Sequence, residues 1–245
     1  MKLAKKKVIE VIMKLNKNTT LKEIVKTYPQ TIEVLNTLSI DYCCGGDDTI
    51  EKAVKENNGN LEEILSLLEE KSSEKNMDEG AVFSIDEFKI LSINDMIDSL
   101  INTHHLRERE LLSELDELIN KILLVHYNSH KDQLVKVHHL FGTLKTELEE
   151  HFAKEEKVVF ELIKNNPNPT EEIKSYIEEV ESEHDVAGEI LKELKVVTDN
   201  FTAPSDGCFS YNKTFEKLEE LVNDVFVHVF KENSILFPEY FDLVK

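Results

Sequence analysis

The chain has 245 residues with few glycines and prolines, no tryptophan, and apolar residues that recur at helical spacing, which together predict an all-α protein. A formal charge of −20, with only two arginines, argues against a nucleic-acid partner, because phosphate binding needs a basic stripe. No segment approaches the ~20 apolar residues of a membrane span. The three cysteines make no disulfide framework, so we expect a cytoplasmic protein with reduced thiols.

Residues 1–70 are predicted to form a small helical module. Its start, up to about residue 16, is expected to be a helix, because the apolar run at 8–13 is interrupted by an acidic residue and no small-residue cleavage site follows. Two capping-box patterns, each with a polar residue followed three positions later by Glu, begin short helices at Thr20/Glu23 and Asn60/Glu63.

A Cys-Cys-Gly-Gly turn containing Cys43 and Cys44 lies between these two helices. We expect an exposed tight turn, on which adjacent thiolates could bind iron or exchange with a disulfide. The alternative is that two small residues simply close a helix, and the pattern alone supports both interpretations equally. The third cysteine, Cys208, lies in the 201–210 connection and receives no predicted role.

Residues 71–91 are polar and irregular, which predicts a linker before a second domain at 92–245. That domain contains four long segments with helical periodicity, separated by breaks rich in Asn, Pro, Ser and Gly. Four amphipathic helices with short connections predict an up-down-up-down four-helix bundle. The expected helices cover 92–125, 130–164, 171–199 and 211–236.

The core-facing positions of three of these helices include polar residues. Spacing that alternates between three and four places His151 and Glu155 in one core-facing stripe, His184 in the next, and His228 and Glu232 in the last. Residues four apart lie one turn apart on one face, so each pair can bind the same ion. Unpaired charges in a core would cost several kcal/mol each, which a pair of metal ions would offset. Imidazole and carboxylate ligands without thiolates favour iron or manganese over structural zinc.

The first long helix allows two core-facing stripes, one through His104 and one through His105, and periodicity does not choose between them. Glu108 lies on both stripes. It is either a third carboxylate near the site or a solvated residue at the bundle edge, and the second interpretation is favoured. Four other histidines fall near a helix end or on a polar face and are expected at the surface: His126, His130, His138 and His139.

At these motifs the sequence resembles the "repair of iron centres" family, hemerythrin-like di-iron proteins that join a Cys-Cys-Gly-Gly module to a hemerythrin-like bundle. The resemblance covers nearly the whole chain. Its matching stretches are Asp41–Gly46, His105–Glu110, His151–Glu156, Ser182–Glu189 and His228–Pro238.

The resemblance implies two iron ions joined by an oxo bridge, with His105 rather than His104 as the ligand from the first helix. The implied ligands are His105, His151, Glu155, His184, His228 and Glu232, with the two glutamates bridging. Some relatives carry a histidine where this chain has Glu108.

The implied function is repair of iron–sulfur proteins damaged by nitric oxide or peroxide, through supply of iron, with a thiol role for Cys43 and Cys44. The alternatives are a di-iron enzyme that reduces nitric oxide or peroxide, and a sensor that binds oxygen or nitric oxide. Enzyme activity and a homodimer both remain open at this stage.

Overall fold

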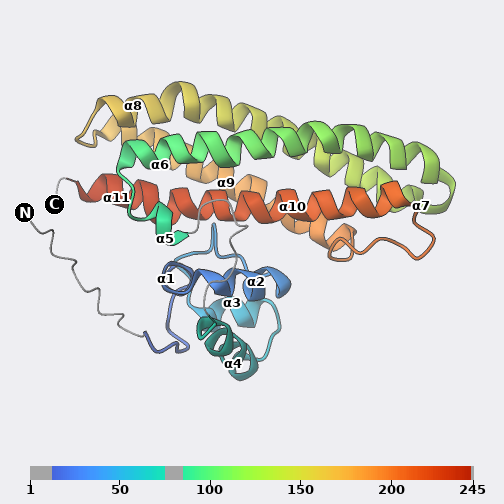
Figure 1. The fold of residues 1–245 in the computed structure, drawn as a ribbon, viewed down its shortest axis with the longest axis horizontal. Coiled ribbons are helices and arrows are strands. Elements are labelled where there is room, and N and C mark those ends of the chain that lie inside the picture. The colour runs from blue at the N-terminus through green and yellow to red at the C-terminus, as the bar shows by residue number, and fades with distance from the viewer. Residues whose placement is uncertain (1–12, 75–84, 244–245) are drawn as a thin grey trace, which may run out of the picture.

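The computed structural model describes residues 13–74 and 85–243, and these ranges are helical apart from their connections and one isolated β-bridge (Figure 1). This confirms the predicted all-α class. The helix expected near the N-terminus lies mostly outside the described residues, and residues 13–16 are not helical.

Within residues 13–74, the N-terminal module has four short α-helices and one 3-10 turn. Thr20 begins the first helix with the predicted capping box, in which its side chain and that of Glu23 each accept from the other's backbone N–H. Asn60 also caps its helix, but its side chain accepts from the N–H of Glu62, so the reciprocal box expected with Glu63 is replaced by a simpler cap. The elements are α1 (Leu21–Thr27), η1 (Pro29–Thr31), α2 (Ile32–Thr37), α3 (Ile50–Glu56) and α4 (Leu61–Ser72).

The described residues of the predicted linker, 71–74 and 85–91, include helical turns that pack against the rest of the protein. Within this linker, α4 continues to Ser72, and the short helix α5 (Ile85–Phe88) buries both of its terminal apolar side chains. The Phe88 ring lies 5.2 Å from the Lys231 ammonium, which places α5 against the last bundle helix. Residues 81–83, a small apolar patch within this predicted linker, lie outside the described ranges.

The larger domain is an up-down-up-down bundle, as predicted (Figure 1). The first two helices are nearly continuous and reverse direction at His130, whose φ of −130° and ψ of 28° are not helical. The helical elements are α6 (Ile93–Leu100), η2 (Ile101–His105), α7 (Leu106–Lys154), η3 (Glu155–Val159), α8 (Phe160–Asn165), α9 (Glu171–Val197), α10 (Phe209–Lys231), η4 (Glu232–Leu236) and α11 (Phe237–Asp242).

Three π-helical turns interrupt the bundle helices, each at a residue predicted to bind metal. His105 is the last residue of η2, Glu155 the first of η3, and Glu232 the first of η4. A π turn inserts one extra residue into a helix and shifts the side chains that follow around the axis, and such turns occur often at functional sites. Here they adjust the directions of side chains that must converge.

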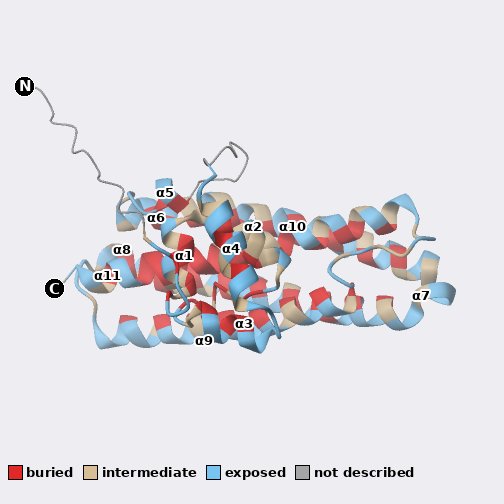
Figure 2. Cartoon of the chain, turned by 90° about the horizontal axis from the view of Figure 1, so that it is seen from below, coloured by how far each residue is buried: buried red, intermediate tan, exposed pale blue. Residues whose placement is uncertain are grey.

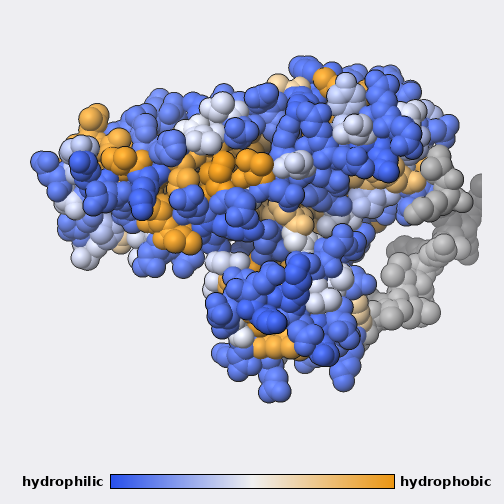
Figure 3. Space-filling model, turned by 180° about the vertical axis from the view of Figure 1, so that it is seen from behind, coloured by the Kyte–Doolittle hydropathy of each residue, from blue (hydrophilic) through white to orange (hydrophobic). Residues whose placement is uncertain are grey.

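The module packs on the bundle through an aromatic contact. Tyr42, beside the cysteine turn, has no exposed surface and meets the rings of Phe226 and Phe230 on α10 edge-on, at centroid distances of 6.1 and 5.9 Å. Buried residues therefore continue from the bundle interior into the module (Figure 2). Hydrophilic residues cover most of the face shown in Figure 3, although apolar patches interrupt it on both parts. None of the helices in 13–74 and 85–243 combines the length and apolarity needed to span a bilayer.

Candidate metal centre

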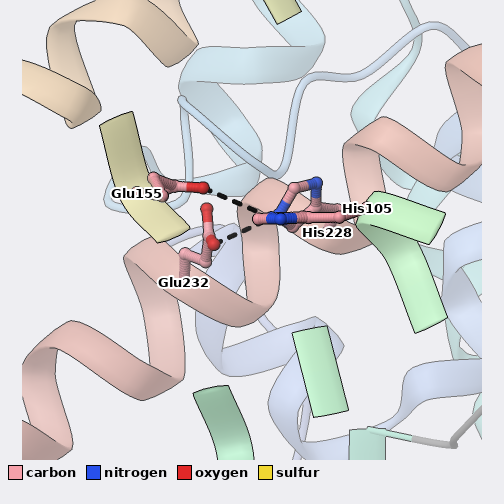
Figure 4. Close-up of side chains that lie close together, drawn as sticks. All are labelled: His105, Glu155, His228 and Glu232. Atoms are coloured by element: carbon pink, nitrogen blue, oxygen red, sulfur yellow. Dashed lines mark hydrogen bonds and ion pairs between the residues drawn. The ribbon is translucent and has the colours of Figure 1, made fainter. Parts of the chain in front are cut away.

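Two imidazoles and two carboxylates from four turns of the bundle meet in its interior (Figure 4). The Nε2 atoms of His105 and His228 are 3.1 Å apart. Nε2 of His105 lies 3.3 Å from Oε2 of Glu155, and Nε2 of His228 lies 3.1 Å from Oε1 of Glu232. These four ligand atoms form a compact, buried group.

A second group lies beside the first and uses the same two carboxylates. The Nε2 atoms of His151 and His184 are 3.0 Å apart. Nε2 of His151 lies 3.4 Å from Oε2 of Glu155, and Nε2 of His184 lies 3.2 Å from Oε2 of Glu232. Glu155 and Glu232 therefore belong to both groups, as two bridging ligands would.

All six predicted ligands are thus brought together, and their polar atoms fit a pair of cations. Among the described residues, Oε1 of Glu155 has no polar partner, while Oε2 of Glu155 and Oε2 of Glu232 lie 3.2–3.4 Å from imidazole Nε2 atoms without hydrogen-bond geometry. Both carboxylates are fully buried, and a carboxylate oxygen left unsatisfied in a core is costly. A metal ion in each group would satisfy them.

The ionisation of the metal-free site also favours bound metal ions. Burial disfavours the charged form of His228, but Glu232 and Glu108 outweigh it and hold the imidazole pKa well above its usual range. Burial likewise opposes charge on Glu232, yet His228 and His184 lower the pKa of that carboxyl. Without metal the site therefore relies on protons as its positive charge, and metal ions would replace them.

Each of the four imidazoles has a fixed orientation, because its Nδ1 atom donates to a side-chain oxygen. An acceptor at Nδ1 fixes the tautomer and directs Nε2 at the metal. The pairs are His105 with Glu156 (2.9 Å), His151 with Glu183 (2.9 Å), His184 with Asn233 (2.9 Å) and His228 with Glu108 (3.0 Å). Sequence reasoning missed the first three acceptors, although each directly follows or precedes a predicted ligand.

Glu108 is not a solvated residue, so that interpretation is wrong. It has no exposed surface, and its Oε1 accepts from His228, which makes it the third carboxylate near the site. Burial raises the pKa of Glu108 to about 7, against the lowering effect of His228. Burial of the Glu108 carboxylate is tolerated because the His228 imidazole pairs with it.

His104 is also buried, but it lies in a different cluster from the six ligands. Its Nδ1 is 2.9 Å from Oδ2 of Asp224, and its Nε2 is 2.9 Å from Nζ of Lys231. Burial lowers the pKa of His104 to about 4, so the ring is neutral and accepts from the lysine. Both core-facing stripes predicted for this helix therefore point inward, and only His105 reaches the carboxylates shared by the two groups.

Of the four histidines expected at the surface, His138 and His139 are exposed and the other two are half-buried. These two lie at the bundle end near the α9–α10 connection. Nε2 of His126 is 3.1 Å from Sγ of the exposed Cys208, and Nε2 of His130 is 2.9 Å from Oδ1 of Asp206. The tertiary fold covers them because the connection returns over the α7 reversal.

The cysteine turn lies against the bundle, and the prediction that it is exposed is wrong. Cys43 is buried and Cys44 is half-buried, with Sγ of Cys44 3.5 Å from the backbone oxygen of the metal-site residue His184. A Cβ atom at Gly188 would lie 3.4 Å from this sulfur, which places the turn in van der Waals contact range of α9. The Cys44 thiol and burial raise the pKa of Cys43.

Asp41 organises this turn and ties it to α9. Its Oδ1 accepts from the backbone N–H groups of Cys43 (3.2 Å) and Cys44 (3.0 Å), and its Oδ2 lies 3.0 Å from Nζ of Lys192. Burial opposes its ionisation, but the bonds from Lys192 and Cys43 hold the pKa of Asp41 below its usual value.

We expect Asp41→Asn, which keeps the accepting oxygen but loses the charge, to lower the free energy of unfolding by only about 0.5–1 kcal/mol at neutral pH, because Lys192 is partly exposed. A carboxyl with a depressed pKa stabilises the fold above its unfolded-state pKa and loses that effect as pH falls through the folded value. The difference between wild type and variant, measured by denaturant titration, should therefore shrink as pH falls below the ordinary value of 3.8 and vanish once the pH is below the lowered folded-state pKa. A difference that persists in acid would contradict the ion pair.

Both parts of the chain match known protein families. Residues 96–240 match the family described as hemerythrin HHE cation binding domain, and residues 17–72 match a domain of unknown function, DUF542. A probable iron-sulfur cluster repair protein of Haemophilus influenzae is 32% identical over 220 residues, which cover 89% of this chain and 94% of that protein. The iron-sulfur cluster repair protein YtfE of Enterobacter sp. (strain 638) is 31% identical over 88% of this chain and 93% of its own.

Proposed function

Because this chain belongs to the hemerythrin HHE family and, within it, to the iron–sulfur cluster repair proteins, we propose that it holds two iron ions and supplies iron to clusters damaged by nitric oxide or peroxide. The partners in this proposal are the damaged iron–sulfur proteins. The six ligands are those predicted from the sequence: His105, His151, Glu155, His184, His228 and Glu232.

One observation carries the proposal: two buried groups, each of two imidazoles and two carboxylates, share Glu155 and Glu232. Such a ligand set suits iron, which accepts nitrogen and oxygen ligands together. Bound iron would supply redox chemistry and a transferable ion. The protein's own residues contribute four fixed imidazoles, two shared carboxylates, and an apolar surround that keeps bulk water out.

The test is transfer of iron from the purified, iron-loaded protein to an apo iron–sulfur protein. We expect two irons per chain by metal analysis, and loss of iron from this protein in step with recovery of the acceptor's cluster absorption. Repeated reduction of nitric oxide or peroxide by a protein that keeps its iron would instead support the di-iron enzyme. A gas-induced conformational change with neither result would support the sensor.

The proposal also gives the cysteine turn a part in transfer, since Sγ of Cys44 lies 3.5 Å from the backbone of His184. Replacing Cys43 and Cys44 together with serine is expected to leave two irons bound but to slow their transfer, because the variant loses thiols that could receive the ion. The measurement is the rate of acceptor recovery at equal iron loading.

Cys208→Ser is the matched control for this variant, because Cys208 is exposed and lies at the bundle end near the α9–α10 connection. It should transfer iron at the wild-type rate. A Cys43/Cys44 double variant that also transferred at the wild-type rate would rule out the thiol role and leave the metal site unaffected.

A further inference from the structure

The four metal-site imidazoles differ in the group that accepts from Nδ1. Three of them donate to carboxylates: His105 to Glu156, His151 to Glu183, and His228 to Glu108. His184 alone donates to an amide, Oδ1 of Asn233, at 2.9 Å. The two groups of ligands are therefore unequal, although they share both carboxylates.

This difference changes how strongly an imidazole binds metal. A carboxylate that accepts from Nδ1 gives the ring partial anionic character and makes Nε2 a stronger donor, whereas an amide oxygen is neutral and polarises the ring less. Changing such an outer partner typically alters metal affinity by roughly 10–100-fold. His184 is thus the weakest of the four imidazole ligands.

The three carboxylates are also unequal, because basic side chains neutralise two of them. Glu156 accepts from Arg109 at 2.7 Å, and Glu183 pairs closely with Lys154. Glu108 has no exposed surface, and its second oxygen has no hydrogen-bond partner among the described residues. The group of His105 and His228 therefore has two carboxylate acceptors, whereas the group of His151 and His184 has one carboxylate and one amide.

Access favours the other group. A narrow pocket with the apolar lining Leu148, Ala187, Val225 and Val229 is also lined by His151, His184 and His228, but not by His105, so it meets both imidazoles of one group and one imidazole of the other. The cysteine turn lies at the same place, with Sγ of Cys44 3.5 Å from the backbone oxygen of His184. The weaker group is therefore the one nearest to both a pocket and a thiol.

We propose that the iron held by His151 and His184 is the one that leaves, and that Asn233 sets how readily it does so. This inference rests on the proposed function in assuming that the site holds two irons. Asn233 acts through His184 and is a positioning residue. Transfer breaks the bonds to His151, His184 and the two shared carboxylates, and the acceptor's ligands take the ion at unchanged oxidation state, so no oxidant or reductant is needed.

The test is iron release from the loaded protein to an excess of a coloured phenanthroline-type chelator. The wild type should lose its two irons in two resolved phases of equal amplitude. Asn233→Asp keeps an accepting oxygen and adds a charge, so we expect it to slow the fast phase roughly 10–100-fold and leave the slow phase unchanged. A single phase in the wild type, or a fast phase that Asn233→Asp does not slow, would overturn the proposal.

Glu108→Gln is the reciprocal variant, because it turns the acceptor of His228 into an amide. It should accelerate the slow phase by a similar factor and leave the fast phase alone. If Asn233→Asp fails to fold, Glu108→Gln still tests which group releases its iron first. Acceleration of the fast phase in Glu108→Gln would contradict the assignment of the two groups.

The result also separates this inference from the proposed function. Two phases that respond as expected, in a protein that never restores an apo iron–sulfur acceptor, would remove the repair role and keep the inference. A protein that restores the acceptor normally but releases its iron in one phase would keep the repair role and remove the inference. A protein that binds no metal would contradict both.

Discussion

Glu155→Gln is expected to leave the purified protein almost free of iron. Glu155 lies within reach of both imidazole pairs, 3.3 Å from Nε2 of His105 and 3.4 Å from Nε2 of His151. A glutamine side chain has the same shape but no charge, and a neutral amide is a poor ligand for iron. Because one carboxylate serves both ions, its loss should remove both, and metal analysis together with optical spectra measures this directly.

Glu150→Gln is the matched control for that variant. Glu150 lies on the same helix, α7, but is exposed, so the same change of charge should leave two irons bound. If Glu155→Gln retained two irons, Glu155 would not be a bridging ligand. Retention of one iron would place the carboxylate in a single group and contradict the shared arrangement.

The helical spacing of the sequence alone predicts the bundle and five of the six proposed ligands. Histidine and glutamate four residues apart share a helix face, and they fall among apolar core positions where α7 continues into η3 and α10 into η4. His105 was different. Both His104 and His105 are buried, so a rule that separates core from surface could not distinguish them.

The features that sequence reasoning missed depend on details finer than helical periodicity. The π turns at His105, Glu155 and Glu232 each add a residue, which shifts the side chains that follow away from the positions that regular spacing predicts. Glu108 was misjudged because a lone glutamate is normally solvated, and only the imidazole of His228 across the core makes its burial tolerable.

The cysteine turn was misjudged for a related reason. Cys-Cys-Gly-Gly predicts a turn correctly, and turns usually lie at the surface of the unit that contains them. This surface is covered by a second unit, because Tyr42 packs on α10 and Sγ of Cys44 lies 3.5 Å from the backbone oxygen of His184 on α9. Contacts between two parts of a chain leave no periodic signal in either part.

Removing the metal is expected to destabilise the wild-type protein substantially. A ligand at 100 times its dissociation constant adds about 2.7 kcal/mol to the free energy of unfolding, so two bound ions should add several kcal/mol. We expect a chelator to lower the midpoint of thermal unfolding, and metal addition to restore it. An equal midpoint with and without metal would mean that the ions do not bind the native bundle selectively.

In the metal-free state, Glu155→Gln is expected to stabilise the protein, whereas removal of metal destabilises the wild type. Oε1 of Glu155 is buried without a polar partner among the described residues, Oε2 lies 3.3–3.4 Å from two imidazole nitrogens without hydrogen-bond geometry, and an unsatisfied buried group costs about 1–3 kcal/mol or more when charged. Glutamine removes the charge, and its amide can donate to Nε2 of His105 or His151. Metal-free Glu155→Gln should therefore unfold at a higher denaturant concentration than metal-free wild type. A lower midpoint for the variant would mean that protonated imidazoles already compensate Glu155, so that stability alone would not require a metal.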